Sequence, residues 1–339
     1  MNRPLLVIVA LSALLFAIAV ISLAIGAVSI PLSSMVGMLF GVSSAAFTET
    51  EAAIVSQLRL PRILTACLVG SSLGAAGVGF QCLFRNPLAD PYVIGASSGA
   101  GLGVTLAVII GFHVNFLGFS GISLAALIGS VLAVIVVYGI GSIGGQNSPL
   151  SLLLAGVALS SMINAVVSLL MFMNDEKIVV IFGWLMGSLA GNDWHVVRAT
   201  TASSLVGCGL LWSMSRPLDA NLLGEAAAQS LGLHTVKFRL LIVTAAGITT
   251  AAAVSAAGII GFVGLIAPHI ARAFVGPRHA WLTPTSAIVG AIILLVSDGI
   301  ARTVVAPAEL PVGIVTALLG CPFFLFLLKS RHGLASLRT

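Results

Sequence analysis

The chain has 339 residues, of which 59% are hydrophobic and 7% are charged, and its mean hydropathy is +1.17. A soluble domain carries about 25% charged residues. The few charged side chains of this sequence could not cover a water-soluble globule, so the composition excludes a soluble enzyme and indicates a polytopic membrane protein.

Runs of apolar residues long enough to cross a bilayer recur along the whole chain. A helix needs about 20 such residues to span the hydrocarbon core. The sequence therefore predicts an all-α fold, with one transmembrane domain over 1–339 and about ten spanning helices. The stretch from Leu240 to Val275 is much longer than one span needs, so we divide it at the glycines that begin with Gly258. The predicted spans are 5–28, 63–84, 93–112, 117–140, 150–173, 194–214, 238–257, 259–276, 281–300 and 311–328.

The distribution of Lys and Arg predicts the orientation, because cytoplasmic loops are enriched in both residues. With the N-terminus in the cytoplasm, ten of the 15 basic residues lie on the inner side. This distribution favours both termini inside and explains the net charge of +5 without nucleic acid. The first run exceeds the roughly 7–15 apolar residues of a signal peptide, so we expect a retained span. The basic residues on the outer side are Arg59, Arg62, Lys177, Arg198 and Arg302.

Three stretches between the spans are long enough to carry structure of their own. Residues 29–60 predict an outer loop. Residues 174–193 hold an apolar run too short to span, which predicts a short outer helix. Residues 215–237 form the largest inner loop and have a helical pattern. One face of that helix would hold Leu222, Leu223, Ala226 and Ala227, with Asp219 or Asn221 as a possible cap.

Small residues and cysteines predict packing. Glycines at four-residue spacing let membrane helices approach closely. The four cysteines lie far apart in apolar stretches, so the sequence predicts neither a metal site nor a disulfide framework. The glycine sets are Gly70/Gly74, Gly95/Gly99/Gly103 and Gly183/Gly187/Gly191.

Two other classes of membrane protein stay open at this point. An ion-coupled carrier usually holds an ionisable group at mid-membrane depth. Only Asp298 could be embedded, and it precedes Arg302 by one helical turn, which favours a structural ion pair. An intramembrane serine protease would pair a serine of 95–99 (GASSG) with His269, but no acidic residue stands out to orient that histidine. No Walker loop occurs, so the chain cannot bind ATP phosphates through one.

Several segments, in chain order, resemble the FecCD family of permeases for iron chelates, haem and vitamin B12. The resemblance covers nearly the whole chain. It implies a ten-span permease that pairs with a second copy or a homologous permease. It also implies two cytoplasmic ATPase subunits that carry ATP and Mg, and a periplasmic or lipid-anchored binding protein. The matching segments are RLPR at 59–62, NPLADP at 86–91, GASSGA at 95–100, EAA at 225–227 with Gly232, FVGLIAPHIAR at 262–272 and APAELPVG at 306–313.

The resemblance also implies roles for individual positions. The arginines that receive acidic knobs of the binding protein are Arg59, Arg62 and Arg302. The cytoplasmic gate matches Asn86 and Leu88, and its second element falls near Ser148 and Leu150, where Pro149 interrupts the match. The inner loop would couple to the ATPase through Asp219, Leu222, Gly224, Glu225, Ala226, Ala227 and Gly232.

We expect the translocation path at a homodimer axis, along the fifth span and the short outer helix. From Leu152 to Met173 that span carries no charged residue. A weakly interacting wall would ease the release of bulky cargo. The path residues expected on these two elements are Asn164, Ser168, Met171, Phe172, Trp184, Met186 and Gly187.

Together these expectations describe a subunit of an ABC importer in the inner membrane of a prokaryote. It would hold no cofactor or metal of its own and would move a metal chelate inward by ATP-driven alternating access. Within the resembling family an iron(III)-siderophore is the commonest cargo, and haem and cobalamin are the alternatives.

Overall fold

The computed structural model describes residues 3–26, 48–112, 114–116, 119–143 and 148–329. Helices dominate this part of the chain, and the only strands described in it are β1 (Asn115–Phe116) and β2 (Phe119–Ser120), which pair antiparallel. The prediction of an all-α fold is confirmed.

Each of the ten predicted spans overlaps one helix of 13 residues or more. In the described part of the chain, six helices have the length and apolar composition to cross a membrane, namely α1, the continuous helix Glu49–Leu83 that contains α4, and α6, α7, α12 and α14. The number of spans and the cytoplasmic location of both termini stay predictions. The ten helices are α1 (Arg3–Ala24), α4 (Leu60–Leu83), α5 (Ala96–Ile110), α6 (Gly121–Gly141), α7 (Pro149–Met173), α9 (Trp194–Ser213), α12 (Thr235–Ala257), α13 (Val263–Val275), α14 (His279–Thr303) and α15 (Val312–Lys329).

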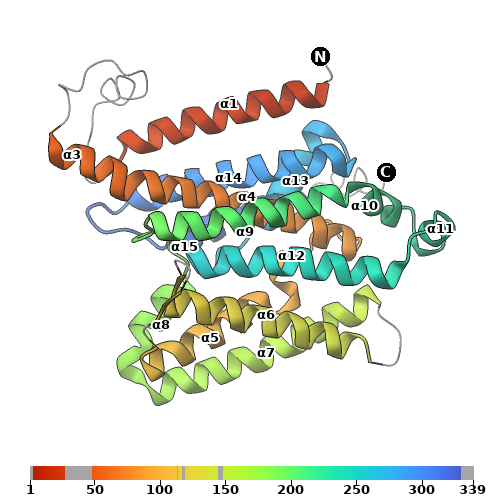
Figure 1. Ribbon diagram of the computed structural model, residues 1–339, viewed down its shortest axis with the longest axis horizontal. Coiled ribbons are helices and arrows are strands. Elements are labelled where there is room, and N and C mark those ends of the chain that lie inside the picture. The colour runs from red at the N-terminus through yellow and green to blue at the C-terminus, as the bar shows by residue number, and fades with distance from the viewer. Residues whose placement is uncertain (1–2, 27–47, 113, 117–118, 144–147, 330–339) are drawn as a thin grey trace.

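The long helices lie roughly along one axis, with α1 at one edge of the bundle and α5, α6 and α7 at the opposite edge (Figure 1). We call the end with α10 (Ser215–Leu222) and α11 (Glu225–Ser230) the inner end, and the end with α3 (Glu49–Ala53) and α8 (Ile178–Leu185) the outer end. The helix α4 runs through the middle, and almost all of its residues are buried. The predicted short outer helix is α8, preceded by η4 (Asp175–Lys177).

Glycines bring the backbones of neighbouring helices into contact around α4. A Cβ atom on Gly70 would lie 2.4 Å from the carbonyl oxygen of Gly290, and one on Gly77 would lie 1.9 Å from that of Gly264. Gly99 and Gly103 likewise face the backbone of α6. The predicted close approach is therefore confirmed for Gly70, Gly74, Gly99 and Gly103, whereas Gly95 meets only side chains at ordinary contact distance. It is wrong for Gly183 and Gly191, where a Cβ would meet nothing within 4 Å.

The outer loop predicted at 29–60 is wrong over its last part, and residues 27–47 lie outside the described ones. The α3 helix, η2 (Ile54–Arg59) and α4 form one continuous helical stretch. It begins with a capping box, in which the Thr48 side chain accepts from the N–H of Glu51 and the Glu51 carboxylate accepts from the N–H of Thr48.

Two helix breaks separate elements that hydropathy alone would join. In the inner loop, Gly224 has φ +105°, a conformation that favours glycine, and it divides α10 from α11. The single helical face expected there is therefore wrong. Asp219 and Asn221 lie inside α10 and do not cap α11. The division at Gly258, which has φ +70°, is confirmed, and residues 258–262 separate α12 from α13.

Candidate functional site

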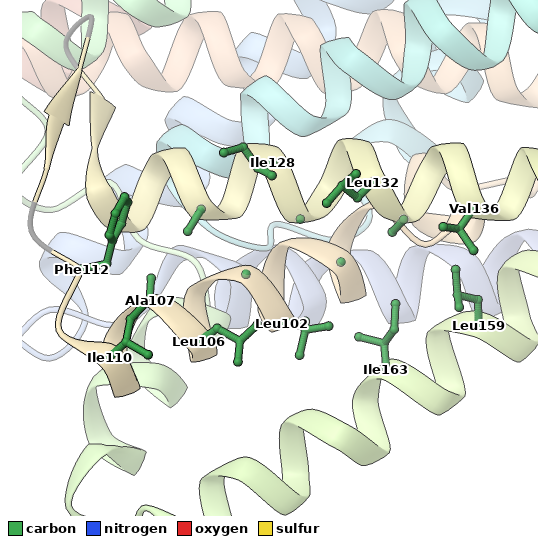
Figure 2. Close-up of a pocket in the computed structure, with 15 residues that line it drawn as sticks. Leu102, Leu106, Ala107, Ile110, Phe112, Ile128, Leu132, Val136, Leu159 and Ile163 are labelled. Atoms are coloured by element: carbon green, nitrogen blue, oxygen red, sulfur yellow. The ribbon is translucent and has the colours of Figure 1, made fainter.

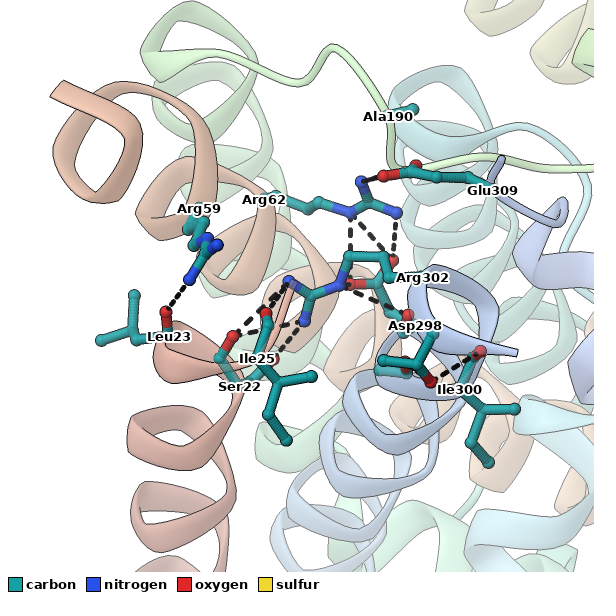
Figure 3. A network of polar contacts seen from close by, with 12 residues as sticks. Ser22, Leu23, Ile25, Arg59, Arg62, Ala190, Asp298, Ile300, Arg302 and Glu309 are labelled. Carbon is teal, nitrogen blue, oxygen red and sulfur yellow. Dashed lines mark hydrogen bonds and ion pairs between the residues drawn. The ribbon is translucent and has the colours of Figure 1, made fainter. Parts of the chain in front are cut away.

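An ion-pair cluster at the outer end joins α4, α14 and the segment that follows α14 (Figure 3). The Arg62 guanidinium lies 2.9 Å from Oδ1 of Asp298 and 2.8 Å from Oε2 of Glu309. Nε of Arg302 lies 3.1 Å from Oδ2 of Asp298. The Asp298 side chain is fully buried, whereas that of Glu309 is 41% exposed. Asp298 is thus the buried centre of the cluster, and its predicted ion pair with Arg302 is confirmed.

Two arginines of the outer end hold the last turn of α1. Nη1 of Arg59 donates to the carbonyl oxygen of Leu23 at 2.6 Å. Arg302 donates to the carbonyl oxygen of Ile25 at 3.2 Å and to the hydroxyl of Ser22. Because the last carbonyls of a helix have no partner within it, these guanidiniums cap the C-terminus of α1.

The predicted docking arginines all lie at the outer end, but their side chains differ in access. Arg59 and Arg302 are buried and engaged within the chain. Arg62 is 13% exposed and pairs with the exposed Glu309, so an external carboxylate would have to replace Glu309 to reach it. Docking at the three positions stays a prediction, with Arg62 the most accessible of them.

At the inner end, α10 is held firmly against α4 and α14. Nε of Arg85 donates to the carbonyl oxygen of Asn221 at 3.0 Å, and Nδ2 of Asn221 donates to that of Cys82 at 2.9 Å. Oδ1 of Asp219 lies 2.6 Å from Nδ1 of the buried His279. Asp219, predicted as a coupling residue, therefore ties α10 to the start of α14. The sequence interpretation named Asn221 only as a possible cap and missed its contacts with α4, and it missed Arg85 and His279, because the partners of all three are distant in the chain.

The neighbouring α11 is joined to α12 by an ion pair and lies among exposed apolar side chains. Nη2 of Arg239 on α12 lies 2.7 Å from Oε1 of Glu225, and Ala228 is buried. Gly224 and Gly232, both with positive φ, flank the helix. Exposed apolar side chains outside the spans mark surfaces that bind other proteins. Those at this end are Leu222, Leu223, Ala226, Ala227 and Leu231.

The residues predicted to form the gate have local structural roles. Oδ1 of Asn86 accepts from the N–H of Leu88 at 2.9 Å in the turn after α4. Ser148 caps α7 and accepts from the N–H of Ser151 at 3.0 Å, and Leu150 is exposed. Gating by these four residues stays a prediction.

A polar clamp that the sequence interpretation missed joins η3 (Pro91–Ile94) to the break between α12 and α13. The Tyr92 hydroxyl donates to the carbonyl oxygen of Ile260 at 3.0 Å and accepts from its N–H at 3.1 Å. Oδ1 of Asp90 accepts from the N–H of Tyr92 at 2.9 Å. The Asp90 carboxylate also accepts from the N–H of Phe262, which has φ +68°. Asp90 belongs to the segment 86–91, whose only earlier signal was the family resemblance, and Tyr92 lies outside the segments that carry it.

The clamp predicts a pH dependence of stability. Burial raises the pKa of Asp90 from 3.8 to about 6, against the two backbone hydrogen bonds, which lower it. Because the pKa of Asp90 is higher in the folded chain than in the unfolded chain, the folded chain binds this proton more tightly. Protonation of Asp90 therefore stabilises the fold at low pH, and this contribution is lost as the pH rises from about 4 to about 6. Unfolding midpoints of the wild type and Asp90→Asn over this range should diverge, with the wild type losing stability relative to the variant. Parallel curves would contradict the prediction.

The predicted path residues lie on two different surfaces. On α7, Ser161, Asn164 and Ser168 share an exposed stripe, Met171 is half-buried and Phe172 is exposed. Because an amide such as that of Asn164 is costly in hydrocarbon, this stripe should meet protein or water rather than lipid tails.

The outer-helix residues border a separate groove of ≈ 520 Å³ between the end of α8, the 259–261 segment and α15. Met186, Ile259 and Gly313 line it. At Gly187, which has φ +71°, a Cβ would lie 2.5 Å from the carbonyl oxygen of Ile259, and Trp184 is half-buried. No α7 residue lines the described part of this groove.

The protease interpretation finds no support in the described residues. The Ser98 hydroxyl bonds the carbonyl oxygen of Gly95 and the Ser160 hydroxyl. The His269 ring packs edge-on against Phe323. The structure thus gives both the serine and the histidine packing and hydrogen-bonding roles.

Comparisons with known proteins agree with this geometry. The FecCD transport family matches residues 14–330. The chain is 40% identical over 288 residues to the cobalamin import system permease protein BtuC of Halobacterium salinarum, covering 84% of this chain and 75% of that protein. It is 39% identical over 333 residues to the Fe(3+)-citrate import system permease protein YfmE of Bacillus subtilis, covering 97% and 96%.

A solved structure described as an inward-facing conformation of a metal-chelate type ABC transporter matches with a TM-score of 0.82 and 36% identity, over 95% of this chain and 98% of that one. The chain therefore belongs to the FecCD transport family, whose members are permease subunits of ABC transporters with ATPase activity on separate subunits.

Proposed function

We propose that the chain is the membrane-spanning subunit of an importer for a metal chelate. The observation that carries this proposal is the inner end, where α10 is pinned to α4 and α14, and where the exposed alanines of α11 lie between the exposed Leu222, Leu223 and Leu231. Such an element can seat in a groove of an ATPase and pass its movement into the bundle. The ion-coupled carrier is less well supported, because Asp298 is already paired with two arginines and the Asp90 carboxylate is held by the backbone N–H groups of Tyr92 and Phe262.

An iron(III)-siderophore is the cargo that we favour. A relative that matches 97% of this chain is named for iron(III) citrate. Others are named for cobalamin and for hemin, which are also metal chelates, so cobalamin and haem are the alternative cargoes. The compound that co-purifies with the cognate binding protein would distinguish them.

The assembly that we propose has two copies of this chain, or this chain and a homologue, in the inner membrane of a prokaryote. The polar stripe of α7 would face the partner copy across the path, because an exposed amide needs a protein or water contact. Two ATPase subunits with ATP and Mg would bind α10 and α11. A binding protein would dock at the outer end, with Arg62 the accessible cation.

Substitution of Ala227 tests the coupling surface. The arginine in Ala227→Arg would stand in the exposed small face of α11, where a bulky charge obstructs seating in a groove. We expect the variant permease to insert normally but to lose most co-purifying ATPase and its stimulation by the binding protein. Ala53→Arg, an exposed alanine at the outer end, is the matched control and should keep the ATPase. Undiminished ATPase retention by Ala227→Arg would place the coupling surface elsewhere.

A further inference from the structure

A second groove, unrelated to the inner end and to the α7 stripe, runs between α5, α6 and α7. Its volume is ≈ 450 Å³, and its lining is almost wholly apolar. Figure 2 shows side chains of α5 and α6 along its length, with two residues approaching from α7. The labelled lining residues include Leu102, Leu106 and Ile110 on α5, Ile128, Leu132 and Val136 on α6, and Leu159 and Ile163 on α7.

The shape of this groove follows from the glycines beneath it. A Cβ on Gly103 would lie 2.1 Å from the carbonyl oxygen of Ala125, so α5 and α6 pack backbone against backbone. Only Leu159 and Ile163 line the groove from α7. A long channel therefore remains between the closely packed pair and α7.

The groove lies at the depth of the lipid tails. Both α6 and α7 are candidate membrane spans, and about two thirds of each faces outward. The α6 lining runs from Ala125 to Val136, about 16 Å at 1.5 Å per residue. This length matches one leaflet of the hydrocarbon core, about 15 Å. Water is a poor occupant, because the apolar walls offer it too few hydrogen-bond partners.

A more polar pocket continues the groove at the outer end. It has a volume of ≈ 400 Å³ and shares Ala107 and Phe112 with the apolar groove. Ser120 and the exposed Lys177 also line it. In the described residues, no ion pair joins Lys177 to a carboxylate. The channel thus has an apolar length and a more polar mouth lined by the cation of Lys177, whose chain neighbours Asp175 and Glu176 do not line the pocket.

We propose that this channel binds one phospholipid, with an acyl chain in the apolar groove and the phosphate beside Lys177. Along the channel the lining changes from apolar side chains to polar ones and ends at the Lys177 cation, just as a phospholipid changes from an apolar acyl chain to an anionic phosphate. A second copy of this chain fits less well. On α7, Asn164 lies about 100° and Ser168 about 140° from the groove-lining Ile163, so the polar stripe faces away from the groove.

Native mass spectrometry of the purified, assembled transporter tests this proposal, with phosphatidylglycerol or phosphatidylcholine added as the probe. The wild type should retain one phospholipid per permease chain after the others are removed, and should prefer the anionic lipid. Leu132→Trp fills the groove at a 56% exposed position and should lower retention at least fivefold. Lys177→Gln should reduce the preference for phosphatidylglycerol roughly fivefold, the effect of losing one cation near a head group.

Two matched variants control for general damage. Leu205→Trp changes an exposed leucine of α9 that lines neither part of the channel, and Arg198→Gln removes another exposed cation of the outer end. Both should retain lipid as the wild type does. Equal retention by Leu132→Trp and Leu205→Trp would overturn the proposal. A disulfide between two copies of the Ile110→Cys variant would also overturn it, because a second copy would then cover the groove that Ile110 lines. Unchanged lipid preference in Lys177→Gln would overturn the assignment of the phosphate.

Discussion

Replacing Asp298 with alanine is expected to lower the free energy of unfolding by about 3–5 kcal/mol, the cost of leaving a buried charge without its partner. Asp298 is fully buried and pairs with both Arg62 and Arg302. In the Asp298→Ala variant, Arg62 keeps Glu309 as a partner. Arg302 keeps hydrogen bonds only to the neutral groups of Ser22 and Ile25, and the nearby Glu309 is bound to Arg62, so the buried charge of Arg302 loses its direct partner.

Glu309→Ala is the matched control for this experiment. Glu309 also binds Arg62, but its side chain is 41% exposed, so its loss should cost at most about 1 kcal/mol. Unfolding in mixed micelles gives the two free energies. Hydrogen exchange in the last turn of α1 supplies a second measurement, because Arg302 caps that turn. Equal destabilisation by the two variants would show that Asp298 is not the centre of the cluster.

The positions of the long helices could be predicted from the sequence, because spanning a bilayer demands apolar runs of a fixed length. The ion pair of Asp298 and Arg302 could also be predicted, because residues four apart lie side by side on a helix. The burial of Arg302 could not be predicted in this way. Its contact with Ser22 joins residues 280 positions apart, and no local pattern records it.

The inner loop and the α12–α13 break show a second limit. The sequence predicts a helix within 215–237. The division of that helix at Gly224 depends on backbone conformation and on the hydrogen bond from Asn221 to Cys82, which the local pattern does not contain. Gly258 marked a turn correctly. The five residues from 258 to 262 leave the helix because Tyr92 and Asp90 satisfy the backbone groups of Ile260 and Phe262, and those partners lie in another segment.

Gly77→Ala is expected to destabilise the bundle by about 1–3 kcal/mol or more, because α4 and α13 cross with their backbones in contact. A Cβ on Gly77 would lie 1.9 Å from the carbonyl oxygen of Gly264, a backbone atom that cannot move aside alone. The methyl group would therefore separate the two helices, just beyond the break that Tyr92 holds.

Gly209→Ala on α9 is the matched control for Gly77→Ala. It lies within a helix, and a Cβ there would meet nothing within 4 Å. Because alanine favours a helix over glycine by about 1 kcal/mol, this variant should be as stable as the wild type or slightly more stable. Thermal unfolding of the purified variants measures both effects. If Gly77→Ala were as stable as Gly209→Ala, α4 and α13 would not cross as closely as the structure shows, and the helix that begins at the clamp would be free to shift along α4.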